Sequence, residues 1–239
     1  MNVYETDRLL SEYLIFHYAN EREILPWDFG PKEALDYAVR VTKPFSSKPV
    51  ARALDVGCAV GRSSYELSRN CEEVIGIDFS EAFVTAAEEI KKGPLAVKRL
   101  EEAHEETSLE VALPEGLYVE RCLFEKGDAM NLREDLGQFD RVLAANLICR
   151  LPQPQYFLDR LPGLVTPGGE LVLATPCTWL EEFTPGAEWP EGSTLQWLKE
   201  KLSADFDLVS EGNEPFLIRE TARKFQWTVA LVTKWARKA

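Results

Sequence analysis

Short apolar stretches alternate with longer polar or amphipathic segments from residue 51 onward. Runs rich in Val, Ile and Leu occur at Ala51–Val56, Glu73–Ile77, Val119–Phe124, Phe139–Ala145 and Glu170–Thr175. This alternation is typical of βαβ units, whose parallel strands form a sheet that helices cover on both faces. Two further runs, Phe206–Ser210 and Phe225–Val232, have only a short loop-like stretch between them, which suits an antiparallel edge hairpin. The pattern predicts an α/β fold with a seven-stranded, mostly parallel sheet.

The first 50 residues follow a different pattern. They are rich in aromatic residues and broken by prolines, and Leu10, Leu14 and Tyr18 recur at the i, i+4 spacing of a helix. We therefore expect helices and a loop here rather than a series of strands. Residues 1–50 are predicted to be a helical cover over the ligand site of the main domain, residues 51–239, and to form one compact unit with it.

Two stretches interrupt the strand–helix alternation. Residues 93–118 hold a charged, helical-looking piece that includes Lys98–Glu106, and we interpret them as a solvated surface insertion. Residues 176–192 follow the fifth strand and carry two tryptophans, a phenylalanine and four glutamates. Because α/β proteins bind ligands at the carboxyl ends of their parallel strands, this aromatic loop is a candidate lid.

The charge balance restricts the partners that we expect. The chain has 27 Lys and Arg against 40 Asp and Glu, a formal net charge of −13. Binding a polynucleotide mainly through its phosphates requires a basic surface, so a small molecule is the favoured ligand. No apolar run approaches the roughly 20 residues of a membrane span, and the opening MNVYETDRLLSE lacks the order of a signal peptide. We expect a cytoplasmic protein with no membrane or nucleic-acid partner.

The five cysteines and two histidines are dispersed along the chain. No two cysteines form a CxxC pair, whereas a structural metal site needs ligands clustered at short spacings. We therefore expect no metal and predict reduced, mostly buried thiols. With only two histidines, the chain is also a poor candidate for a Ser-His-Asp hydrolase.

A turn of small residues follows the first strand. The segment from Asp55 reads Asp-Val-Gly-Cys-Ala-Val-Gly-Arg-Ser-Ser, and a helix is expected from Ser64 to Arg69. Such a turn lets a ligand approach the backbone, and the helix start offers free N–H groups, so a nucleotide-like ligand is expected. A nicotinamide fingerprint would need glycines at 59 and 62, and no Gly-Lys-Ser/Thr of a P-loop follows. The carboxylate of Asp55 would repel a pyrophosphate and attract an ammonium or sulfonium group.

Three more polar residues follow strands two, three and four. Asp78 ends the second strand, where an acid can accept hydrogen bonds from both ribose hydroxyls, and Phe79 beside it could pack on an adenine. Asp128 follows the third strand and Asn146 the fourth. Taken singly, an acid such as Asp128 is more often a helix cap or a solvated loop residue, and Asn146 is equally suited to a helix N-cap.

The arrangement Asp-x-Gly-x-(Ala/Gly)-x-Gly resembles motif I of class I S-adenosylmethionine (SAM) methyltransferases, and Ala59 in place of the usual middle glycine is a departure from it. The resemblance implies a Rossmann-like fold in which the loop and its acidic neighbour hold the methionine part of SAM. Asp78 would bind the ribose, Asp128 the adenine amino group, and Asn146 would face the transferring methyl. The implied cofactor contacts are Asp55, Gly57, Cys58, Ala59, Gly61, Ser63, Asp78, Phe79, Ser80, Asp128, Ala129 and Asn146.

Other stretches of the sequence indicate a more specific family. The chain resembles the 4-mercaptohistidine (5-thiohistidine) N1-methyltransferase family of ovothiol biosynthesis in six segments, residues 4–18, 25–31, 58–63, 145–147, 178–185 and 223–227. This implies methyl transfer from SAM to an imidazole nitrogen, with S-adenosylhomocysteine (SAH) as product. Nothing resembles the iron-binding oxidative half of the bifunctional ovothiol synthase. We therefore expect a standalone methyltransferase, functionally paired with a sulfoxide synthase.

The implied acceptor needs a free nitrogen lone pair and a closed site. Asn146, Tyr13 or His17 could select the tautomer, although a histidine among aromatic residues is more often structural. The expected substrate contacts are Trp179, which could close over the ring, Tyr18, Arg150 or Arg223 for a carboxylate, and Glu181 or Glu182 for an ammonium group. Two alternatives stay open, a SAM methyltransferase of another small metabolite and a non-catalytic SAM-binding regulatory partner; a nicotinamide oxidoreductase ranks below both.

Overall fold

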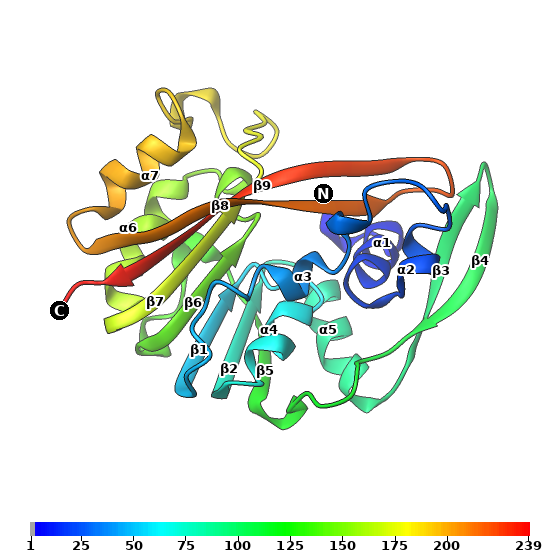
Figure 1. The fold of residues 1–239 in the computed structure, drawn as a ribbon, viewed down its shortest axis with the longest axis horizontal. Coiled ribbons are helices and arrows are strands. Elements are labelled where there is room, and N and C mark those ends of the chain that lie inside the picture. The colour runs from blue at the N-terminus through cyan, green and yellow to red at the C-terminus, as the bar shows by residue number, and fades with distance from the viewer. Residues whose placement is uncertain (1–2) are drawn as a thin grey trace.

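The computed structural model describes residues 3–239 and contains a seven-stranded sheet (Figure 1). Its strands lie in the order β5-β2-β1-β6-β7-β9-β8. The first five in this order run parallel, whereas β9 is antiparallel to both β7 and β8. The strands are β1 (Val50–Val56), β2 (Cys71–Asp78), β5 (Cys122–Lys126), β6 (Phe139–Ala145), β7 (Val165–Thr175), β8 (Phe206–Arg219) and β9 (Phe225–Arg237). The predicted fold class is confirmed.

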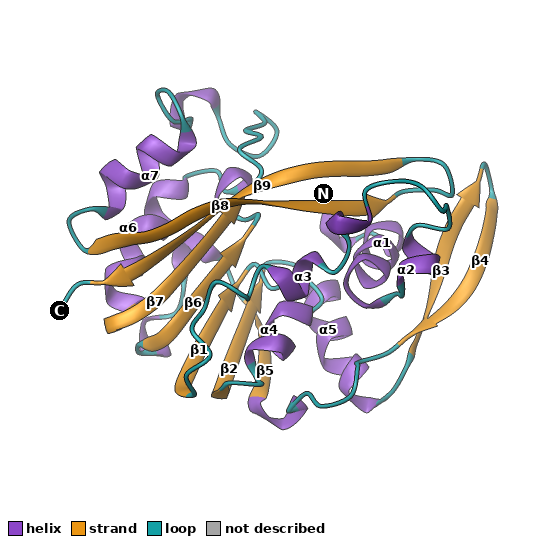
Figure 2. Ribbon diagram, in the orientation of Figure 1, coloured by secondary structure: helices purple, strands orange, loops and turns teal. Residues whose placement is uncertain are grey.

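Helices cover both faces of this sheet (Figure 2). One face packs on α4 (Arg62–Leu67) and α5 (Glu81–Glu89), and the other on α6 (Pro154–Leu164) and α7 (Thr194–Leu202). Successive strand residues point to opposite faces, so Ala53 and Leu54 of β1 belong to different core clusters. The amino-terminal segment adds α1 (Asp7–Tyr18), α2 (Glu21–Ile24) and α3 (Tyr37–Arg40). Within residues 3–239, no helix has the length and apolar character needed to cross a membrane.

The charged segment after α5 is a β-hairpin, so the helix predicted over Lys98–Glu106 is wrong. Strand β3 (Leu95–Glu102) pairs antiparallel with β4 (Glu105–Val111). The insertion is also not entirely solvated, because Val97 and Val111 are buried in the same core cluster as Leu14 of α1. Its two-residue periodicity is easily missed because the face that carries Val97 and Val111 also carries polar residues, among them Arg99 and Thr107.

The edge hairpin is longer than predicted. Strand β8 continues to Arg219, so residues 211–219, expected to be loop-like, are strand, and only residues 220–224 form the turn. Pro215 within β8 is compatible with this because β8 is an edge strand, where a missing N–H breaks no ladder. The tip of the β8–β9 ribbon extends past β7 and bonds β3, since the N–H of Ala222 donates to Glu101 O at 3.1 Å, and α1 packs against both β3 and β8 (Figure 1).

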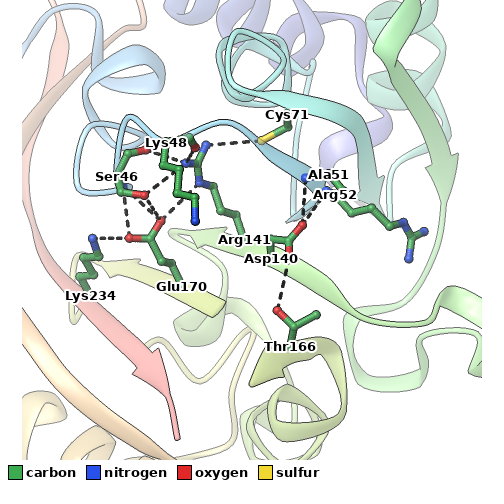
Figure 3. A network of polar contacts seen from close by, with 10 residues as sticks. All are labelled: Ser46, Lys48, Ala51, Arg52, Cys71, Asp140, Arg141, Thr166, Glu170 and Lys234. Carbon is green, nitrogen blue, oxygen red and sulfur yellow. Dashed lines mark hydrogen bonds and ion pairs between the residues drawn. The ribbon is translucent and has the colours of Figure 1, made fainter. Parts of the chain in front are cut away.

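A buried ionic network joins the chain leaving α3 to the sheet (Figure 3). Arg141, in the amino-terminal half of β6, donates to the carbonyl oxygens of Ser46 (2.6 Å) and Lys48 (2.5 Å) and pairs with Glu170 (3.3 Å). Glu170 also binds Lys234 of β9 at 2.6 Å. The network holds the connection between the amino-terminal segment and β1 at the amino-terminal ends of the parallel strands. Asn146 lies at the opposite, carboxyl ends.

Candidate active site

The loop that joins β1 to α4 adopts left-handed backbone conformations. The φ angles are +77° at Gly57, +48° at Ala59 and +87° at Gly61. A Cβ added at Gly61 would lie 2.7 Å from the ring of Phe124, so this position has no room for a side chain. Ala59 adopts a conformation that residues other than glycine rarely take. This strain costs of order 1 kcal/mol of folding free energy.

Asp55 is turned away from the open side of this loop. Its carboxylate is buried and accepts a 2.6 Å hydrogen bond from the hydroxyl of Ser64 in α4. Burial raises the pKa of Asp55 to about 7, although the bond from Ser64 acts in the opposite direction. The structure thus differs from the expectation of a direct electrostatic contact with a cation, because the carboxylate supports the start of α4.

Asp78 lies at the end of β2 and contacts the loop directly. Its Oδ2 accepts the backbone N–H of Ala59 at 2.9 Å, and its Oδ1 accepts that of Ser80 at 2.9 Å. Burial raises its pKa above the ordinary value, against these hydrogen bonds. Phe79 beside it is 59% exposed, a large apolar ring left open next to the carboxylate. The side chain of Ser80 is fully buried, because it caps α5 and donates to the carbonyl of Tyr4.

The loop after β5 lies next to that of Asp78. The N–H of Gly127 donates to the backbone oxygen of Asp78 at 2.9 Å, so the two strand ends are adjacent. Asp128 Oδ1 accepts the N–H of Met130 at 2.9 Å and caps a short 3-10 helix, in which Ala129 is buried. The capping role considered for Asp128 is therefore present, at the same edge as Asp78.

Asn146 is the first residue after β6 and has a φ of +56°. Its N–H donates to Ala174 O of β7 at 2.8 Å, and its side-chain Oδ1 accepts the hydroxyl of Tyr37 at 3.2 Å. The helix N-cap considered for Asn146 is not observed, because the following 3-10 helix, Ile148–Arg150, is preceded by Leu147 and has no side-chain cap. The role of Tyr37 was missed, and the aromatic richness of residues 1–50 was the only signal for it.

Aromatic rings from three separate segments meet near these residues. Tyr13 of α1 lies 4.8 Å from Phe83 of α5, and Tyr4 contacts both Phe83 (5.8 Å) and Phe183 (6.4 Å) between ring centroids. Phe183 belongs to the loop of residues 176–192. Arg150 donates to Thr178 O of the same loop at 2.7 Å, and its guanidinium lies 5.1 Å from the ring of Phe183. The amino-terminal segment and this loop are thus joined around Arg150.

His17 and Tyr18 lie where α1 meets α4 and the glycine loop. Tyr18 donates its hydroxyl to the carbonyl of Val60 at 2.6 Å and so ties α1 to the loop. The Nδ1 atom of His17 is buried without a hydrogen-bond partner. Burial lowers the pKa of His17 to about 3, and the positive charge of Arg62 acts in the same direction. The imidazole is therefore neutral at physiological pH and can accept a hydrogen bond.

Two further predicted substrate residues make other contacts. The indole N–H of Trp179 donates to Thr194 of α7 at 3.0 Å, and the ring packs edge-on against Trp197. Arg223 is exposed in the β8–β9 turn with its guanidinium 5.6 Å from the ring of Trp27. Glu182 is exposed in its loop. The structure brings Tyr13 close to Asp78 and Arg150, with Asn146 after β6 at the same end of the sheet, and the side chains of Trp179 and Arg223 make their contacts elsewhere.

Comparison with known proteins finds a matching family model and related sequences. A family model described as a methyltransferase domain matches residues 47–235. The chain is 27% identical over 158 residues to the chloroplastic tocopherol O-methyltransferase of Arabidopsis thaliana, covering 63% of this chain and 39% of that protein. It is 30% identical over 125 residues to the ubiquinone biosynthesis O-methyltransferase of Pseudomonas aeruginosa, covering 52% and 44%. The chain thus spans less than half the length of these curated relatives.

Solved structures share the fold. The N-methyltransferase NodS from Bradyrhizobium japonicum, in complex with SAH, superposes with a TM-score of 0.55 at 15% identity over 96% of this chain and 99% of that one. The YcgJ protein of Bacillus subtilis gives 0.57 at 13% identity, over 85% and 98%. At these identities the likeness concerns the fold alone.

Proposed function

Since this chain belongs to the methyltransferase-domain family that matches residues 47–235, we propose that it is a SAM-dependent methyltransferase that methylates an imidazole nitrogen of 4-mercaptohistidine to form ovothiol. The cofactor is SAM and the product SAH. The observation that carries this proposal is the junction of the glycine loop with Asp78 at the carboxyl edge of the sheet. Here a tight backbone, a carboxylate and the exposed ring of Phe79 lie side by side.

The residues at this edge fit an adenosyl sulfonium ligand. The backbone of residues 57–61 would hold its amino-acid part, Asp78 its ribose hydroxyls, and Phe79 with the Asp128 loop its adenine. The nearby charged carboxylate of Asp78 suits a cationic ligand better than a pyrophosphate. When bound, SAM supplies an activated methyl group whose C–S bond breaks, with its electron pair left on sulfur, as the acceptor lone pair forms the new C–N bond.

The chain's own residues orient the acceptor and exclude water from it. The rings of Tyr4, Tyr13 and Phe183 pack together near Asp78, and Arg150 provides a cation for an amino-acid carboxylate. Neutral His17 can accept the hydrogen bond of a ring N–H and so leave the other nitrogen unprotonated. The proton that the ring loses after methylation passes to solvent.

The segments that carry the ovothiol resemblance contact one another in the fold. Residues 4–18 meet 58–63 through Tyr18 and Val60, and meet 178–185 through Tyr4 and Phe183. Residues 25–31 meet 223–227, because Arg223 stacks on Trp27. Five of the six segments thus contact another of them in the fold, which supports an acceptor of the same class. A sulfoxide synthase would supply this acceptor by forming its carbon–sulfur bond.

Two measurements test the proposal. Incubation with SAM and 4-mercaptohistidine should give a methylated product and SAH by mass spectrometry, and SAH should bind the wild type in calorimetry. Asp78→Asn should weaken SAH binding by about 30-fold or more, since a charged acceptor is lost from two hydrogen bonds. The matched control is Asp140→Asn, which changes a carboxylate that accepts the backbone N–H groups of Ala51 and Arg52 at the opposite edge. It should bind SAH like the wild type.

Each outcome tests one part of the proposed function. Unchanged SAH binding by Asp78→Asn rejects the cofactor site. SAH binding without methylation of 4-mercaptohistidine rejects the acceptor. The two curated relatives are named O-methyltransferases, so a hydroxyl compound is the second candidate acceptor and belongs in the same assay with histidine and other small metabolites. Binding with no turnover of any acceptor would point to the regulatory SAM-binding alternative.

A further inference from the structure

We infer that Tyr37 is a positioning residue, which orients the amide of Asn146 so that its NH2 group, and not its carbonyl oxygen, is presented to the acceptor. This inference rests on the proposed methyl transfer and adds a selection rule to it. The enzyme takes an acceptor that offers a hydrogen-bond-accepting atom, here the deprotonated sulfur of the thioimidazole, beside the nitrogen to be methylated.

Tyr37 is held rigidly from the amino-terminal segment. Its side chain is 3% exposed, its ring stacks on Phe16 of α1 (6.1 Å, 18°), and it packs against Phe216 of β8 at 5.0 Å. The preceding residue, Asp36, has a φ of +56°, which starts α3 abruptly and sets the direction of the tyrosine. Burial raises the pKa of Tyr37 well above its ordinary value, so its hydroxyl keeps its proton and remains a donor.

Asn146 is equally constrained. Its backbone N–H is bonded to Ala174 O of the neighbouring strand at 2.8 Å, and its φ is left-handed, which asparagine tolerates better than most residues. The side-chain amide is oriented by the Tyr37 hydroxyl, which donates to Oδ1 at 3.2 Å.

The chemical consequence follows from the donors and acceptors of an amide. With Oδ1 bonded to Tyr37, the Nδ2 group still has N–H donors, and these favour a thiolate or another lone-pair-bearing atom of the acceptor. They disfavour an ammonium or a neutral thiol, which would place donor against donor. A bond to sulfur also leaves the ring nitrogen's lone pair free for the methyl group.

A double-mutant cycle tests the coupling. Tyr37→Phe removes only the hydroxyl and should lower kcat/KM for 4-mercaptohistidine about tenfold, the size of one lost hydrogen bond, with the Kd of SAH within about twofold of wild type. In an Asn146→Ala background the same change should alter kcat/KM less than about twofold. The control is Tyr65→Phe, which removes a buried hydroxyl that donates to Ala87 O at 2.6 Å and should leave kcat/KM unchanged.

Asn146→Asp tests the orientation independently and leaves the hydroxyl of Tyr37 in place, so it remains informative even if Tyr37→Phe folds poorly. A carboxylate cannot donate, so kcat/KM should fall more than for Tyr37→Phe, by about 100-fold, while SAH still binds. Full activity of Asn146→Asp, or independent effects of the two residues in the cycle, overturns the inference.

Failure of the acceptor assignment is recognised separately. If the wild type methylates a different molecule, the cycle is measured with that molecule, and the Tyr37–Asn146 coupling holds or fails by itself. If the wild type methylates nothing, the inference falls with the proposed function.

Discussion

The backbone N–H of Ala59 donates a 2.9 Å hydrogen bond to Asp78 Oδ2, which joins the loop after β1 to the residue that ends β2. Parallel neighbours place these strand ends side by side, because Val56 pairs with Ile77. The two elements proposed to hold SAM are therefore one unit, whose geometry depends on the strained alanine.

Ala59→Gly should stabilise the protein. At a φ of +48° an alanine is strained, whereas glycine adopts this conformation freely. The free energy of unfolding of the glycine variant should therefore be higher than that of wild type by about 0.5–1 kcal/mol, measured by urea denaturation. The affinity for SAH should not fall, because the N–H that binds Asp78 is retained. Ala53→Gly, in the extended backbone of β1, is the control and should be destabilising. A loss of stability for Ala59→Gly would contradict the strain argument.

Asp55→Asn should change how stability depends on pH. The folded pKa of about 7 lies above the ordinary 3.8, so the folded state retains a proton that the unfolded chain releases. The stability that this proton confers is complete below pH 3.8 and is lost as the pH rises to about 7. Asparagine cannot ionise, so between about pH 5 and 8 the variant should gain at least about 1 kcal/mol relative to wild type in urea denaturation.

Ser64→Ala provides the opposite change at the same site. Its hydroxyl holds the pKa of Asp55 down, so removing it should raise this pKa further and extend the loss of stability to higher pH. Parallel stability profiles for wild type, Asp55→Asn and Ser64→Ala would show that Asp55 does not titrate in this range.

Arg141→Met should be strongly destabilising. The change leaves the carbonyl oxygens of Ser46 and Lys48 and part of Glu170 without their buried cation, and breaking such a pair costs about 3 kcal/mol or more. The matched control is Arg133→Met, which removes exposed ion pairs and should cost less than about 1 kcal/mol. Equal losses for the two variants would mean that the network in Figure 3 does not hold the chain.

Trp179→Phe separates two roles for this loop residue. The bond from its indole to Thr194 predicts a loss of about 1 kcal/mol in unfolding free energy, with kcat/KM for the acceptor within about twofold of wild type. Thr194→Val should cause a similar loss that does not add to the first. A large fall in kcat/KM without a change in stability would instead support closure of Trp179 over the acceptor.

The sheet could be predicted from the sequence because each of its strands contains its own run of apolar residues. Strand β6 was located residue for residue, and the seven sheet strands were all found. The β3–β4 hairpin was missed because its burial depends on packing with segments far away in sequence, α1 among them. The length of β8 was missed for the same reason, since residues 211–219 depend on their pairing with β9.

The sequence by itself determined which residues follow which strand, and hence that the glycine loop, Asp78, Asp128 and Asn146 lie at one edge. This holds because the carboxyl ends of parallel strands share an edge whatever packs around them. Only the tertiary structure decided where side chains turn, as in Asp55 toward Ser64. It also decided that Tyr37, 109 residues away, bonds Asn146, because such a contact depends on the packing of α3 and not on any local pattern.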